Sequence, residues 1–168
     1  SMLESFPSLE SALVMVQAAV ADRLAAQPGS RTYGVPSVKA AWYGTATRAG
    51  TIGRSVFWPV PNVDSALVAL QRSKTPRGDT SLRLATFEVC DTAFSKRRKT
   101  LRAALKNWAG SAEVAQELCD RADVDSSIRG EKLGIDDYVR LGSVLLEMRA
   151  EGKIPLTEQD RYAKERRA

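Results

Sequence analysis

Short apolar runs separated by turn residues indicate alternating strands and helices in the first part of the chain. Residues 13–16 are all apolar, which predicts a buried strand. The alanine-rich residues 18–26 stand just before a Pro-Gly pair and predict a short helix. Residues 41–49 alternate small and polar side chains, and residues 65–72 are mostly apolar, so each predicts a further strand.

The pattern becomes helical after a polar stretch at residues 73–80. Apolar side chains then recur at intervals of three, four and seven and predict one long helix ended by Gly110: Phe87, Cys90, Phe94, Leu101, Leu105 and Trp108. Residues 112–121 predict a second helix. A third has the stripe Ile135, Tyr138, Val139, Gly142, Leu145 and Leu146.

These patterns predict an α/β first half followed by an all-α second half. We expect the first domain to cover residues 1–74, a linker 75–80, a helical domain 81–150 and a polar tail 151–168. A sheet of about three apolar strands with one helix is incomplete, because buried strands need neighbours. The chain is therefore expected either to be a piece of a larger sheet or to self-associate through the exposed sheet edge.

Composition excludes several classes of protein. The 168 residues are 43% hydrophobic and 27% charged, as in ordinary globular proteins. No apolar stretch is long enough to span a membrane, so we expect a cytoplasmic protein without a membrane partner. The absence of histidine excludes histidine-based acid–base catalysis and the common zinc sites, and no metal site is predicted. Cys90 and Cys119 lie at apolar helical positions and are expected to be buried free thiols.

Positive charge is concentrated in one segment. Between Thr92 and Ser111 there are six bases and no acid. The next segment, to Asp137, has eight acids and three bases. Such a cluster favours an RNA or DNA backbone, or an anionic membrane surface. The alternative is a solvated face whose bases pair with the neighbouring acids.

Two motifs resemble those of a known enzyme family. Phe57-Trp-Pro-Val-Pro-Asn-Val-Asp-Ser65 is similar to the F-x-P-x-P-x-V-D-S motif of the rRNA adenine N6-methyltransferases. Residues 94–102 resemble the F-x-x-R-R-K-T-[LI]-R signature of their small-subunit branch, the adenine N6,N6-dimethyltransferases that give kasugamycin sensitivity. Arg129-Gly-Glu131 with Leu133 is similar to a third family segment, R-A-E-x-[LI].

The resemblance implies a Rossmann-like fold, S-adenosylmethionine as cofactor, and two adjacent adenines near the 3′ end of small-subunit rRNA, on an assembly particle, as substrate. The family's glycine-rich cofactor loop and its N-L-P-Y motif do not occur in this sequence. We therefore expect a fragment, inactive alone, with the last three strands of the methyltransferase sheet and the helical C-terminal domain. The alternatives are a large-subunit rRNA methyltransferase of the macrolide-resistance type and a non-enzymatic RNA-binding or ribosome-assembly module.

The resemblance also suggests which residues bind RNA. It implies that the loop with Phe57 lines the adenine pocket, and an aromatic ring there could stack on a base removed from its helix. Phe57 or Trp58 could instead be a core side chain, an alternative that we favour for Trp58. No catalytic acid or base is assigned. Six bases could contact RNA phosphates, with the alternative that Arg97 and Arg98 are partly buried: Lys96, Arg97, Arg98, Lys99, Arg102 and Lys106.

Overall fold

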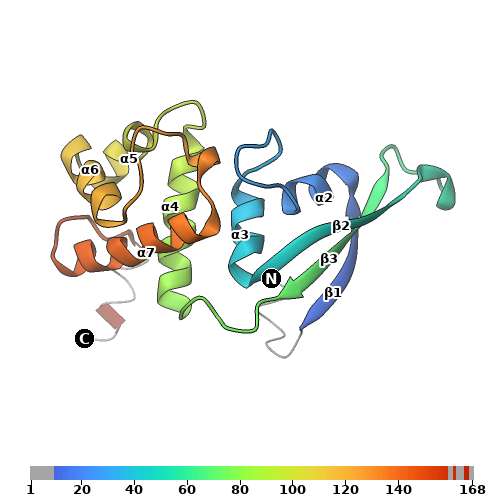
Figure 1. Cartoon of the computed structure of the whole chain (residues 1–168), viewed down its shortest axis with the longest axis horizontal. Helices are drawn as coiled ribbons and strands as arrows, with labels where there is room; N and C mark the ends of the chain where they lie inside the picture. The colour runs from blue at the N-terminus through green and yellow to red at the C-terminus, as the bar shows by residue number, and fades with distance from the viewer. Residues whose placement is uncertain (1–9, 159–160, 162–164, 167–168) are drawn as a thin grey trace. The chain divides into compact units, whose positions relative to one another are not determined.

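The computed structural model describes residues 10–158, 161 and 165–166, and the chain divides into two compact units. The first unit holds the residues up to Asp79 together with Glu131–Ile135. The second holds Thr80–Gly130 and the residues from Asp136 onward. Strands occur in the first unit and, among the described residues, the second contains helices and connecting loops (Figure 1).

The first unit is built on a three-stranded antiparallel sheet. Its elements are β1 (Ser11–Gln17), α2 (Ala18–Leu24), α3 (Val35–Tyr43), β2 (Gly44–Ile52) and β3 (Ser65–Arg72). The strand order is β1-β3-β2, so β3 is central and antiparallel to both neighbours. Val68 of β3 pairs with Val14 on one side and Arg48 on the other. β1 and β2 are thus parallel to each other, with β3 between them.

Alternation along the strands separates a packed face from an exposed one. Ala66 and Val68 of β3 are fully buried against Ala21 of α2, and Val14 and Val16 of β1 pack on the same cluster. Leu13 and Met15, which alternate with these valines on β1, point to the opposite face: Leu13 is 62% exposed and Met15 is 52% exposed. One face of β1 is therefore left uncovered at these two side chains.

A short segment from late in the chain completes the first unit. The Tyr33 hydroxyl donates a hydrogen bond of 2.5 Å to the Leu133 carbonyl, and both residues are buried. The Gly29 amide donates to the Glu131 carbonyl at 2.7 Å. The 27–34 turn region is therefore held in place by residues that lie about 100 positions later in the sequence.

The strands at 13–16 and 65–72 are confirmed, while the strand predicted over 41–49 is displaced to Gly44–Ile52. Helix α3 occupies the preceding residues, with a proline in its first turn and a 3.1 Å hydrogen bond from the Gly34 amide to Ser37 Oγ. Trp42 is buried at the end of this helix. Burial of this helix face accounts for the helical conformation of residues 41–43, which the alternating pattern assigned to a strand.

Among its described residues up to Ala150, the second unit contains four α-helices. They are α4 (Thr80–Ser95), α5 (Leu101–Ala109), α6 (Ala112–Arg121) and α7 (Ile135–Ala150). The prediction of one helix across residues 87–108 is wrong, because the chain leaves α4 at Ser95 and starts α5 at Leu101. Thr100 is the reason for the new start: its side chain caps α5 by accepting a hydrogen bond from the Ala103 amide at 3.3 Å. Gly110, with φ of 107°, ends α5 as predicted.

Helices α4 and α7 meet at a contact that only glycine permits. A Cβ atom on Gly142 would lie 2.5 Å from Thr86 Oγ1 and 2.8 Å from the Thr86 backbone nitrogen. Both residues are buried, and the Thr86 hydroxyl donates to the Leu82 carbonyl at 2.7 Å.

The two cysteines are buried free thiols, as expected, and burial raises the pKa of Cys119 to about 12. Leu146, expected in the apolar stripe, is exposed.

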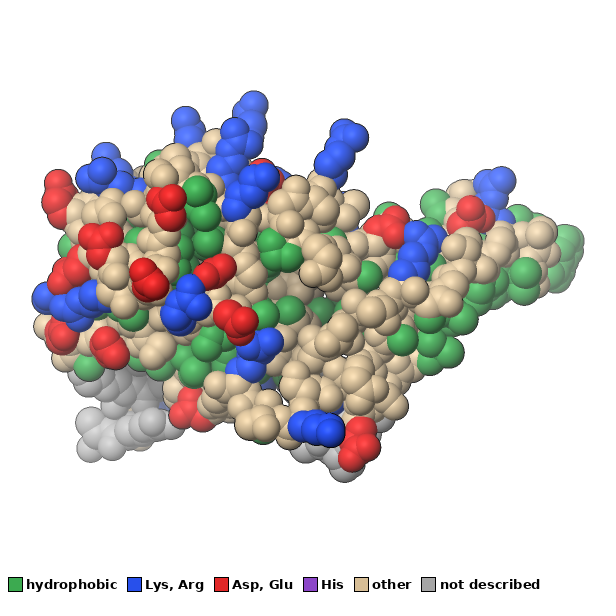
Figure 2. Space-filling model, in the orientation of Figure 1, with side chains coloured by type: hydrophobic (Ala, Val, Ile, Leu, Met, Phe, Trp, Pro, Cys, Tyr) green, Lys and Arg blue, Asp and Glu red, His purple; other side chains and the backbone are tan. Residues whose placement is uncertain are grey.

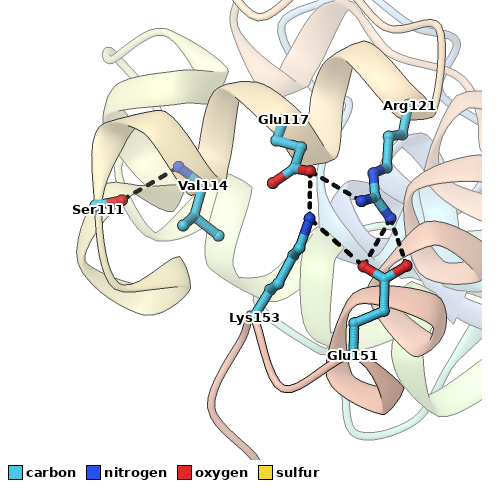
Figure 3. A network of polar contacts seen from close by, with 6 residues as sticks. All are labelled: Ser111, Val114, Glu117, Arg121, Glu151 and Lys153. Atoms are coloured by element: carbon cyan, nitrogen blue, oxygen red, sulfur yellow. Dashed lines mark hydrogen bonds and ion pairs between the residues drawn. The ribbon is translucent and has the colours of Figure 1, made fainter.

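An ion-pair network joins α6 to the end of α7 (Figure 3). Arg121 donates to Glu117 at 2.9 Å and to both oxygens of Glu151 at 3.0 and 3.1 Å. Lys153 donates to the same Glu117 oxygen at 2.8 Å. The hydrogen bond from Lys153 lowers the pKa of Glu117 from its ordinary value of 4.5, with Arg121 acting in the same direction and burial opposing both. Glu151, with Glu117, raises the pKa of Arg121.

This network predicts a pH-dependent contribution to stability. Because the pKa of Glu117 is lower in the folded state, the contribution is present above the ordinary value of 4.5 and is lost as pH falls through the lowered value. Glu117→Gln should therefore flatten the decline of the unfolding free energy below about pH 4.5, as measured by urea titration at several pH values. Lys153→Met should give the same change, since Lys153 is the main cause. An acid limb of unaltered slope in both variants would contradict this assignment.

Candidate functional site

The F-x-P-x-P-x-V-D-S motif forms the tip of the hairpin between β2 and β3. We call residues 53–64 the hairpin tip; it opens with a 3₁₀ turn at Arg54–Val56. Asp64 closes it at the start of β3: its carboxylate accepts from the Arg54 amide at 3.2 Å, and its carbonyl accepts from the Ala18 amide at 2.9 Å. Arg54 Nη1 also donates to the Asn62 carbonyl at 3.4 Å. These bonds tie the two ends of the tip together.

The two aromatic residues of the tip differ in exposure. Phe57 is partly buried, and its amide donates to the Arg54 carbonyl at 3.2 Å. Trp58 is 93% exposed, so the alternative that it is a core residue is wrong. Proline follows Trp58 directly and recurs at position 61. The hydrophobicity of Trp58 favours burial, but Trp58 lies at the tip of the hairpin, outside the packed core of the sheet unit.

The basic segment is mostly a turn between helices. Lys96, Arg97, Arg98 and Lys99 lie between α4 and α5, where the Lys99 amide donates to the Lys96 carbonyl at 2.9 Å. Arg102 and Lys106 follow on α5, and we call these six residues the basic turn region. The prediction of a continuous basic helix is therefore wrong. Four of the six cations lie on a turn because Thr100 restarts the helix after them.

A second loop holds the start of α5 in place. The Leu101 amide donates to the Ile128 carbonyl at 2.7 Å, and the Arg102 amide donates to the Ser126 carbonyl at 3.0 Å. Both donors belong to the first turn of a helix, where amides have no partner within the helix. The loop at residues 126–128 thus satisfies backbone groups just after the basic turn and fixes its exit.

All six cations of the basic turn region are exposed. The alternative that Arg97 and Arg98 are partly buried is wrong, although the Arg97 guanidinium carbon lies 5.9 Å from the centroid of the Phe94 ring. Figure 2 shows Lys and Arg side chains gathered along one side of the molecule, over the helical unit. Within the described part of the chain, no carboxylate forms an ion pair with five of these residues: Lys96, Arg98, Lys99, Arg102 and Lys106.

Two acids of the following segment are paired with bases outside the basic turn region. Glu117 binds Arg121 and Lys153, and Asp137 binds Arg140. The alternative was a solvated face whose bases pair with the acids of the following segment. It is wrong for the five cations that form no ion pair with a carboxylate among the described residues. The basic turn region keeps a positive field that an anion could meet.

Metal and membrane sites are not found among the described residues. No three or more Cys, Asp or Glu side chains lie together there in a way that could hold a metal ion. No helix in that part of the chain is long and apolar enough to cross a bilayer.

Comparison with known proteins identifies the family of the chain. The family model for ribosomal RNA adenine dimethylase matches residues 2–146. The chain belongs to the ribosomal RNA adenine dimethylase family. It is 57% identical over 140 residues to the ribosomal RNA small subunit methyltransferase A of Streptomyces avermitilis, a match that covers 83% of this chain and 48% of that protein. The protein of the same name from Thermobifida fusca is 59% identical over 140 residues, with the same coverage.

Two solved structures share the fold of this chain. A dimethyladenosine transferase from Plasmodium falciparum superposes with a TM-score of 0.73 at 23% identity, covering 90% of this chain and 62% of that one. The 23S rRNA methyltransferase ErmE superposes with a TM-score of 0.56 at 19% identity, covering 83% and 56%. The chain spans about half the length of the curated relatives that it matches.

The residues that the structure describes do not fit a complete S-adenosylmethionine site. A dinucleotide or nucleoside cofactor in such folds is held by a glycine-rich turn between a strand and a helix. Here β1 passes directly into α2 at Gln17–Ala18, with no glycine and no intervening loop. The loop after β2 is the hairpin tip, which returns to β3 instead of entering a helix.

Proposed function

We propose that this chain is the target-base and RNA-contacting part of an S-adenosylmethionine-dependent rRNA adenine N6,N6-dimethyltransferase. The substrate would be two adjacent adenines near the 3′ end of small-subunit rRNA, on a ribosomal assembly particle. The cofactor would be held by the part of the relatives that this chain does not span. The helices from α4 to α7 would form the family's all-α C-terminal domain, and the linker before α4 would connect it to the sheet domain. Strand β1 lies at the edge of the sheet and would pair with β1 of a second copy if the chain self-associates.

The observation that carries this proposal is the basic turn region. Five exposed cations without a carboxylate partner among the described residues lie on the turn or on α5 directly after it, and two backbone hydrogen bonds fix the exit of the turn. Contacts of this kind position a protein on RNA phosphates without reading the base sequence. Folded RNA is recognised largely by its shape and backbone, so such a surface suits a structured ribosomal RNA.

Phe57 is proposed to stack on the target adenine. Methylation of an adenine amino group requires the base to leave its stack and enter a pocket. The Phe57 ring is partly buried on a tip tied together by Arg54 and Asp64, so little conformational freedom remains to be lost. Stacking of a base on an aromatic ring contributes about 1–3 kcal/mol. No acid or base is needed from this ring, because methyl transfer depends mainly on alignment of the reacting atoms.

The small-subunit substrate is favoured over a large-subunit one. Both enzyme types share the motif of the hairpin tip, and the ErmE structure shares the fold at a TM-score of 0.56. The R-R-K-T-L-R run at residues 97–102 is the small-subunit signature. The relatives at 57–59% identity carry the small-subunit name. A non-enzymatic RNA-binding module is the alternative that the chain by itself would satisfy.

Charge reversal in the basic turn region tests RNA binding. The double variant Lys96→Glu with Lys99→Glu should bind a stem–loop RNA with two adjacent unpaired adenines at least about 10-fold more weakly at low salt. Its log Kd against log salt should lose about 1.4 in slope, since each lost phosphate contact contributes about 0.7 on single-stranded RNA. Fluorescence anisotropy over a salt series measures both quantities.

The control is a second double variant with the same change in net charge. Lys74 and Arg161 are exposed and lie outside the basic turn region, so Lys74→Glu with Arg161→Glu should change RNA affinity much less. If both double variants lose affinity equally, the effect is one of net charge. An unchanged salt slope in the Lys96 and Lys99 variant would remove these residues from the RNA interface.

A further inference from the structure

The hairpin tip exposes a larger apolar surface than its proposed adenine contact requires. Trp58 is 93% exposed, and three valines around it are exposed by 71%, 56% and 48%: Val56, Val60 and Val63. In Figure 1 the tip is the end of the β2–β3 hairpin, and Figure 2 shows hydrophobic side chains gathered there. Isolated exposed apolar residues are common, but a nearly fully exposed indole within such a group indicates a binding surface.

The indole is presented by a pre-organised loop. Arg54 and Asp64 join the two ends of the tip, and the Asp64 carbonyl accepts a hydrogen bond from the amide of Ala18, the first residue of α2. The residues at 59 and 61 are prolines, which restrict the backbone on the far side of Trp58. Binding to Trp58 would therefore cost little loop ordering. That property suits a small flat partner that offers few contacts of its own.

Charge at the tip is compatible with an RNA partner. Arg54 and Asp64 are the only charged residues between positions 53 and 64, and they contact each other, with 3.9 Å between Arg54 Nε and Asp64 Oδ1. The tip therefore carries no unbalanced negative charge that would repel phosphates. A protein partner would need more surface, since a standard interface buries about 800 Å² on each side. One planar face is enough for a nucleobase.

We propose that Trp58 stacks on an unpaired nucleobase that neighbours the target adenine in the RNA. The inference rests on the proposed function, because removing an adenine from its stack leaves the adjacent base without a neighbour on one side. Trp58 follows Phe57 directly, so two aromatic rings of one loop could receive two consecutive bases. Phe57 would hold the adenine, and the exposed indole would hold the next base from the solvent side.

The test uses the full chain and two short single-stranded RNAs of equal length. One RNA contains two adjacent adenines, and the other has an abasic nucleotide beside a single adenine. Trp58→Ala should weaken binding of the first RNA by about 5- to 150-fold, the range expected for loss of one stacked base. Trp58→Phe should keep most of the affinity. Leu13→Ala, a control at an exposed apolar residue of β1 outside the tip, should change affinity by less than about 2-fold.

The abasic RNA separates base stacking from other roles of the indole. With that RNA, the unaltered chain and Trp58→Ala should bind equally, because the stacking partner is gone. An equal effect of Trp58→Ala on both RNAs would overturn the inference, as would a loss in Leu13→Ala as large as in Trp58→Ala. If sedimentation shows that Trp58→Ala abolishes self-association and leaves RNA binding intact, the tip is a protein contact and the inference is wrong.

The same data distinguish this inference from the proposed function. RNA binding that depends on Lys96 and Lys99 but not on Trp58 would keep the proposed function and overturn the stacking role. Absence of RNA binding by the unaltered chain would overturn both.

Discussion

Arg149→Met should lower the free energy of unfolding by about 3 kcal/mol or more, the largest effect of the variants considered. The Arg149 guanidinium binds both oxygens of Glu88, at 2.7 and 2.8 Å, and also donates to the Pro155 carbonyl at 3.2 Å. The Arg149 side chain is 8% exposed and that of Glu88 is 22% exposed. The variant would leave a mostly buried carboxylate without its partner, and such a charge costs far more than a surface ion pair contributes.

The Arg149–Glu88 pair joins three helices of the second unit. Glu88 lies on α4, Arg149 on α7, and Trp108 of α5 donates from Nε1 to Glu88 at 3.3 Å. The Arg149 guanidinium carbon also lies 6.0 Å from the centroid of the Trp108 ring. Loss of Arg149 is therefore expected to loosen α5 as well as α7.

Urea unfolding of three variants tests this expectation. Glu88→Gln combined with Arg149→Met should recover part of the stability lost in Arg149→Met, because the uncompensated charge is then removed. Arg121→Met, which breaks the more exposed network of Figure 3, should cost much less. An Arg149→Met protein as stable as Arg121→Met would show that the buried pair does not determine the stability of the unit.

Gly142→Ala should destabilise the protein by about 1–3 kcal/mol, although alanine is the better helix former. The added Cβ would lie 2.8 Å from the Thr86 backbone nitrogen and 2.9 Å from its Cα, so α4 and α7 would have to separate. The gain in helix propensity of about 1 kcal/mol is too small to offset the strain in a buried contact.

The neighbouring residue of α7 provides the control for Gly142→Ala. Ser143 is exposed, and Ser143→Ala should leave stability equal or slightly higher, because it changes helix propensity without changing packing. Thermal or urea unfolding of the two variants measures the difference. A Gly142→Ala protein as stable as Ser143→Ala would mean that the helices can move apart at little cost.

Local patterns were sufficient to predict most elements of the fold. The strand at Ser65–Arg72 and the helix end at Gly110 follow from a short apolar run and from a glycine after an amphipathic stretch. The break at residues 96–100 was not predicted, because the apolar spacing of Phe94 and Leu101 is seven residues and fits a continuous helix. The signal that was missed is Thr100 followed by six helix-forming residues, which is a common start of a helix.

The sequence identified the residues of the candidate site, but it did not predict the exposure of their side chains or their ion pairs. The motif containing Phe57 and the six cations are recognisable in the amino-acid sequence. Whether a side chain is exposed, however, depends on which helices and strands surround it. Trp58 illustrates the limit: its hydrophobicity favours burial, but the strands extend past the packed core and leave it 93% exposed. Likewise, the ion pairs of Glu117 with Arg121 and Lys153 could not be assigned from charge counts alone.

Residues 131–135 belong to the sheet unit although the residues on both sides belong to the helical unit. The polypeptide thus crosses between the two units three times, after residues 79, 130 and 135. Gene truncation at the polar linker before α4 would therefore not yield an intact sheet unit. It would remove Leu133, the acceptor for the buried Tyr33 hydroxyl, and leave a phenol without its partner. Separate expression of the sheet unit would require residues 131–135 to be grafted onto its end or replaced by a linker that restores this acceptor.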